Sequence, residues 1–98
     1  MEDEEQSVLL ERAKNCAKQV GKLYMDWYRE GPFFKELAED KAIFLNDSDF
    51  RAGLAPCLYW ELKKLGLWNP IEDGDWETVC DLAMKSAWDR LQAVQNQA

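Results

Sequence analysis

A regular stripe of apolar residues before the first Gly-Pro pair constrains the fold more than any other feature of the chain. Between residues 6 and 30, apolar side chains recur at alternating steps of four and three residues: Leu9, Ala13, Cys16, Val20, Leu23 and Trp27. This spacing places them on one face of an α-helix. Gly31-Pro32 is a typical helix stop. We therefore predict a helix over residues 6–30 whose stripe, Trp27 included, faces the core.

Glycine and proline divide the rest of the chain into further helical segments. We predict a helix over 33–44, then turn and N-cap residues at 46–49, and a last helix over 75–94 with Trp76 on its core stripe. Pro56 falls inside the pattern between them, where an interior proline costs ~3 kcal/mol. We therefore expect a turn at 48–54, a helix over 56–65, and a loop at 66–70.

These segments predict an all-α fold, because no strand-like alternation stands out. The short connections indicate a small single-domain bundle of four to five helices over residues 1–98, with neighbours mostly antiparallel and with 1–6 and 95–98 frayed. Small residues on the first helix, including Ala13, Ala17 and Gly21, would let a neighbouring helix approach closely.

Charge and signals limit the class of partner and the compartment. The chain carries 19 acidic and 12 basic residues, a formal net charge of -7. This balance argues against direct binding to nucleic acid or to an anionic membrane. The acidic start at residues 1–5 is unlike a signal peptide, and no apolar run is long enough to span a bilayer. The three cysteines are an odd number without a CxxC pair. We expect an intracellular, cytoplasmic protein with reduced thiols.

The residues needed for common catalytic chemistry are missing. The chain has no histidine, so neither its cysteines nor its serines have the usual general base. No glycine-rich phosphate loop is present. The acids at 47–49 and 72–77 fit helix N-termini better than a calcium loop. We therefore expect no enzyme activity, no catalytic residue, no cofactor and no metal.

Five tryptophans in 98 residues favour binding, because tryptophan is enriched at the energetic centres of protein interfaces. Three of them lie off the core stripes or in a loop, and they could either cover the ends of the bundle or face a partner. We predict the second, with acidic residues at the rim. The predicted partner-binding residues are Tyr59, Trp60, Trp68, Trp88, Glu72, Asp73, Asp75 and Glu77.

The sequence thus predicts a non-enzymatic inhibitor, adaptor or regulatory subunit that binds another protein. The acidic rim favours a partner protein with a basic surface. The alternative is an acidic mimic of nucleic acid, as phage anti-restriction and anti-CRISPR inhibitors are understood to be. The acids from Glu72 to Asp81, uninterrupted by a basic residue, motivate that alternative. A structural homodimer built on the first helix is the third hypothesis.

Overall fold

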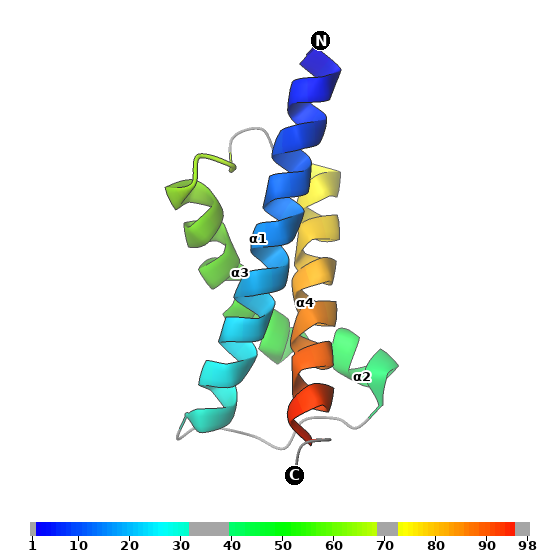
Figure 1. Cartoon of the computed structure of the whole chain (residues 1–98). Coiled ribbons are helices and arrows are strands. Elements are labelled where there is room, and N and C mark those ends of the chain that lie inside the picture. Colours follow the sequence, from blue (N-terminus) through cyan, green and yellow to red (C-terminus); the bar gives the residue numbers. More distant parts are fainter. Residues whose placement is uncertain (1, 32–39, 69–72, 96–98) are drawn as a thin grey trace.

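A computed structural model describes residues 2–31, 40–68 and 73–95, and this part of the chain contains four helices and no strand. They are α1 (Glu2–Glu30), α2 (Lys41–Leu45), α3 (Ser48–Lys64) and α4 (Asp73–Gln95). Figure 1 shows α1 and α4 running in the same direction and α3 running opposite to both. The all-α prediction is confirmed, and the first and last helices cover the expected segments, although α1 begins at Glu2 and not at residue 6.

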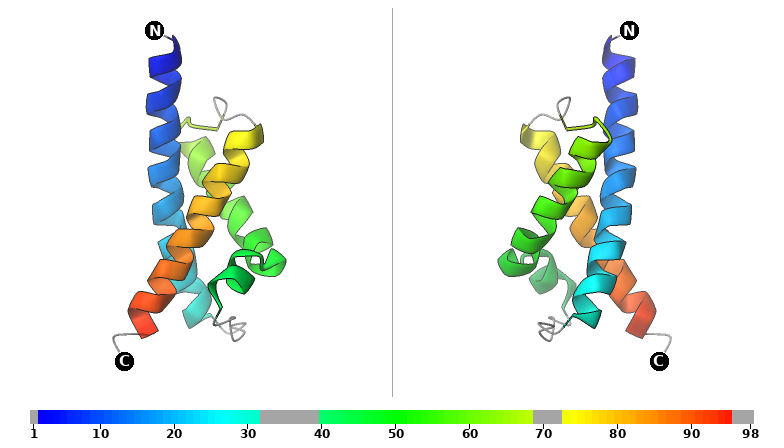
Figure 2. Two further views of the ribbon diagram at one scale, coloured as in Figure 1. Left: turned by 90° about the vertical axis from the view of Figure 1, so that its right-hand side faces the viewer. Right: turned by 90° about the vertical axis from the view of Figure 1, so that its left-hand side faces the viewer.

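Helices α1 and α4 form the largest interface and cross obliquely (Figure 2). Both contribute buried residues four apart. On α1 these are Ala13, Ala17, Gly21 and Met25, and on α4 they are Val79, Ala83, Ala87 and Leu91. Rows at this spacing are the ridges that interdigitate when two helices cross at a steep angle.

This crossing corrects the predicted core stripe of α1. Leu23 is 67% exposed and Trp27 is 65% exposed, although both continue the alternating four-three spacing. Burial on α1 instead follows the four-residue row toward Met25, because α4 lies diagonally across the helix. The predicted stripe is therefore wrong at Leu23 and Trp27, which are surface residues, whereas Val20 is buried as predicted.

The two helices approach each other closely at Gly21. A β-carbon there would collide with the Ala83 carbonyl oxygen, and it would also lie 3.1 Å from the Ser86 β-carbon. Beside this point the Ser86 hydroxyl donates a hydrogen bond of 2.6 Å to the Lys18 carbonyl oxygen. The expectation that small residues allow close approach is confirmed.

Helix α3 is continuous through Pro56, so the predicted break is wrong. Asp47 caps the helix, accepting hydrogen bonds from the backbone N–H groups of Asp49 and Phe50. Pro56 and Ala52, whose carbonyl loses its helical partner, are both exposed. Water can therefore hydrate that carbonyl, while burial of Leu54 and Leu58 on the opposite side holds the helix together.

The end of the bundle that contains the C-terminal half of α1 is closed by α2 and by aromatic packing. Asp40 has extended backbone and caps α2 through the N–H groups of Ala42 and Ile43. The predicted helix over 33–44 is therefore wrong at Asp40, where the backbone is extended. Residues 33–39 of that prediction lie outside the described residues. Phe44 of α2 is fully buried and its ring lies 5.4 Å from that of Trp88.

Across residues 2–31, 40–68 and 73–95, none of the helices is both long enough and apolar enough to cross a membrane.

Candidate functional site

Four aromatic rings form a continuous chain at the other end of the bundle, where α3 ends and α4 begins. The rings of Tyr59 and Trp60 are 5.6 Å apart, and those of Tyr59 and Trp68 are 4.5 Å apart. The Trp68 ring lies 5.0 Å from that of Trp76. All three pairs meet edge to face, which is a favourable arrangement for aromatic quadrupoles. We call these four residues the aromatic patch.

A glycine turn brings the loop tryptophan into the patch. Gly66 has a φ of 73°, a left-handed conformation that costs glycine little. Its N–H donates to the Lys63 carbonyl, and the Leu67 N–H donates to the Leu62 carbonyl at 2.8 Å. This is a Schellman motif, and the burial of both Leu62 and Leu67 supplies its usual apolar contact. The turn thereby directs Trp68 back toward α4.

The patch combines one exposed ring with three that are held in place. Trp60 is 60% exposed. Tyr59, Trp68 and Trp76 are half-buried, and the two tryptophans pack against the core. A ring that is partly fixed before binding loses less conformational entropy when a partner covers it. The patch therefore has the physical properties of a preformed contact surface.

Lys63 completes the patch on α3. Its ammonium group lies 5.4 Å from the centre of the Tyr59 ring and 5.6 Å from that of Trp60. It also donates a hydrogen bond of 3.2 Å to the Tyr59 hydroxyl. These contacts favour the orientation of both rings. Sequence reasoning missed this lysine, although its spacing of four residues from Tyr59 is the signal for such a contact on a helix.

The structure brings together only some of the predicted binding residues. Tyr59, Trp60 and Trp68 meet as expected, and Trp76, which was assigned to the core, joins them while still packing on it. Trp88 does not belong to the patch. It is 8% exposed and packs on Phe44, because α2 covers this part of α4.

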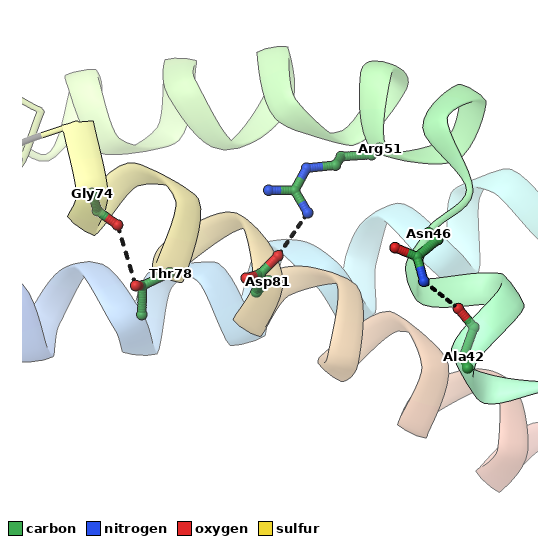
Figure 3. Close-up of polar contacts among 6 residues, drawn as sticks. All are labelled: Ala42, Asn46, Arg51, Gly74, Thr78 and Asp81. Atoms are coloured by element: carbon green, nitrogen blue, oxygen red, sulfur yellow. Dashed lines mark hydrogen bonds and ion pairs between the residues drawn. The ribbon is translucent and has the colours of Figure 1, made fainter.

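The predicted acidic rim is only partly described. Glu72 lies outside the described residues, and of Asp73 only the backbone is described. Asp75 is half-buried and Glu77 is exposed, and they flank Trp76 in the first turns of α4. Farther along, Asp81 accepts a hydrogen bond of 2.7 Å from Arg51 of α3 (Figure 3). The acidic block is therefore locally neutralised at Asp81.

Within the described residues, no three carboxylate or thiol side chains come close enough together to hold a metal ion. The three thiols are separate: Cys57 is exposed, Cys16 is half-buried and Cys80 is buried. Burial raises the pKa of Cys16, with a smaller contribution from the charge of Glu61. Burial also raises the pKa of Cys80, from 9.0 to about 11. Since the thiolate is the nucleophilic form, these two shifts make both thiols less reactive.

The raised pKa of Cys80 predicts a loss of stability in alkali. The folded state binds this proton more tightly than the unfolded state does. Its stabilisation is therefore complete below pH 9 and is lost as the pH rises toward 11. After allowance for solvent screening, we expect a decrease of roughly 1–2 kcal/mol in the free energy of unfolding. Urea titrations at several pH values would measure it.

The matched variant for this effect is Cys80→Ala, which should lose less stability than the wild type between pH 9 and 11. Some decrease should remain, because burial also raises the pKa values of Cys16 and Tyr24. Identical pH profiles for the variant and the wild type would show that ionisation of Cys80 is not linked to folding.

The fold and the site together define a small all-α protein with an aromatic patch at one end of its bundle. No known protein family, no curated protein and no solved structure matches this chain.

Proposed function

We propose that this protein acts by binding another protein through the aromatic patch, as an inhibitor, adaptor or regulatory subunit without enzyme activity. The observation that carries the proposal is the continuous edge-to-face contact of four rings, with Trp60 at its exposed end. Tryptophan and tyrosine in such clusters dominate the binding energy of many interfaces. Asp75 and Glu77 on one side favour a partner that presents basic residues there.

The chain supplies a matched control for this proposal. Trp27 is 65% exposed and Trp60 is 60% exposed. Each ring also lies beside one tyrosine on its own helix, at 5.7 Å from Tyr24 and at 5.6 Å from Tyr59, respectively. Replacing either tryptophan by alanine removes a similar exposed area. Only Trp60 belongs to the aromatic patch.

We expect Trp60→Ala to weaken partner binding about 30-fold, the consequence of losing a central interface residue worth about 2 kcal/mol. Trp27→Ala should bind as the wild type does. The partner would be captured from the source cells with immobilised wild-type protein, purified, and titrated against both variants by calorimetry. Circular dichroism would verify that both variants remain helical. Equal affinities for the two variants would contradict the proposal.

An acidic mimic of nucleic acid remains the alternative for the same protein. The acids on α4 support it, but the ion pair between Arg51 and Asp81 weakens that support. A mimic should lose affinity steeply between about 0.1 and 0.5 M salt, because added ions screen its charges. It should also fail after charge reversal at Asp75 and Glu77. Binding through the aromatic patch should change little over that range of salt.

A further inference from the structure

A basic groove lies between α1 and the C-terminal end of α3. Its volume is about 500 Å³, within the range of ligand-binding clefts. Arg12, Lys18 and Lys22 of α1 line one side of it. Three cations around one groove are unexpected on a chain whose formal net charge is -7. They give the groove a charge opposite to that of the chain as a whole.

The three cations have no ionic partner among the described residues. Two carboxylates on the same helices are already paired, Glu11 with Lys14 at 3.6 Å and Glu61 with Lys64 at 3.4 Å. Arg12, Lys18 and Lys22 form no ion pair with the side chains that the structure describes in residues 7–31, 40–68 and 74–94. The groove therefore presents uncompensated positive charge to whatever enters it.

The remaining lining specifies more than charge. Asn15 and Gln19 lie among the cations, and their amides can both donate to and accept from a peptide backbone. Leu65 and Leu67 also line the groove; Leu67 is buried, whereas Leu65 is 60% exposed. An occupant with carboxylates and one apolar side chain would therefore complement the whole lining.

The length of the groove favours a short peptide segment. From Arg12 to Lys22 the helix rises about 15 Å, which matches four to five residues of extended chain, at roughly 3.3 Å each. A long polyanion such as nucleic acid is disfavoured, because the rest of the acidic protein would repel its flanking charges. A short acidic segment meets only the groove.

We propose that this groove binds an acidic peptide segment that carries an apolar side chain. The groove is distinct from the aromatic patch, although the Gly66 turn connects them by placing Leu67 in one and Trp68 in the other. A protein that also binds a partner through the proposed aromatic patch holds two surfaces at once. The acidic segment in the groove belongs either to that partner or to a third protein. This bridging role is that of an adaptor.

Fluorescence anisotropy with a defined probe tests the proposal. The probe is a fluorescein-labelled pentapeptide with one leucine flanked on each side by two glutamates. Two comparison peptides carry glutamine in place of glutamate, or serine in place of leucine. We expect the wild-type protein to bind the probe at least about tenfold more tightly than either comparison peptide, since each loses one half of the complementarity.

Matched charge reversals localise the binding. The double variant Arg12→Glu/Lys22→Glu should bind the probe at least about tenfold more weakly, because like charges then face each other. The double variant Lys41→Glu/Lys85→Glu makes the same change of charge at exposed positions outside the groove, and it should bind as the wild type does. Trp60→Ala should also bind the probe normally, so failure of the groove and failure of the aromatic patch can be distinguished.

Four outcomes would overturn the proposal. They are equal binding of the glutamate and glutamine peptides, equal loss in the two double variants, absence of probe binding at millimolar protein, and equally tight binding of inorganic tripolyphosphate. Sedimentation adds a fifth. A dimer that dissociates in the Arg12→Glu/Lys22→Glu variant would identify a second copy of this chain as the occupant instead.

Discussion

Replacing Trp88 by alanine should lower the free energy of unfolding by about 3–5 kcal/mol, the usual cost of deleting a large aromatic side chain from a core. Trp88 is 8% exposed, and its ring lies against that of the fully buried Phe44. The cavity would open where α2 packs on α4. Since domains of this size are stable by only about 5–15 kcal/mol, the variant should lose a large fraction of its stability. Urea titration followed by circular dichroism would measure the difference.

Two comparison variants separate this effect from a general sensitivity to loss of tryptophan. Trp60→Ala removes an equally large side chain from the surface and should cost less than about 1 kcal/mol. Trp88→Phe keeps an aromatic ring in the core and should cost less than Trp88→Ala. If Trp60→Ala destabilised the protein as much as Trp88→Ala does, the assignment of one residue to the surface and the other to the core would be wrong.

Gly21→Ala should destabilise the protein by about 3 kcal/mol, at the upper end of the cost of overpacking a core. Alanine is the better helix former by up to about 1 kcal/mol, so local propensity alone predicts the opposite sign. The steric conflict outweighs propensity because the new β-carbon would meet the backbone carbonyl of Ala83, which no side-chain rotation can move aside. Either α1 or α4 would have to shift.

Gly74→Ala is the matched control for this substitution. Gly74 also lies in a helix, and a β-carbon there would meet no atom within 4 Å apart from its chain neighbours and the backbone of its own helix. Propensity then acts alone, and we expect a small increase in stability of up to about 1 kcal/mol. Thermal unfolding of both variants would measure the contrast. A stabilising Gly21→Ala would show that α1 and α4 are not in contact at that point.

Local sequence signals predicted most of the helices but not how they pack. Periodicity and the glycines and prolines located α1 and α4, but they placed the start of α3 at residue 56 instead of at Ser48. The predicted break at Pro56 was wrong because helix propensity counts the lost hydrogen bond but not the surroundings of Ala52, an exposed residue whose carbonyl water can hydrate. The predicted face of α1 was wrong at Leu23 and Trp27. A helix that crosses α1 at an oblique angle buries a different row of its residues from a helix aligned with its axis.

The candidate site was also predicted only in part, because local sequence signals do not show how the helices pack. Tyr59 and Trp60 are adjacent in the sequence, and Trp68 follows a recognisable glycine turn, so their nearness to one another was within reach of local reasoning. The exclusion of Trp88 and the inclusion of Trp76 depend on which end of α4 meets α3. The groove between α1 and α3 likewise combines residues about fifty positions apart, Gln19 and Leu65 among them.

The sequence by itself determined that this chain is helical, acidic and rich in tryptophan, because these properties follow from composition and from interactions within a few residues. Only the tertiary structure decided which tryptophans face solvent, since that depends on where α4 crosses α1 and where α2 covers the bundle end. Small residues at Gly21 and Ala83 allow the close approach of α1 and α4. In the packed structure Trp27 and Trp60 are exposed, whereas Trp88 is buried against Phe44.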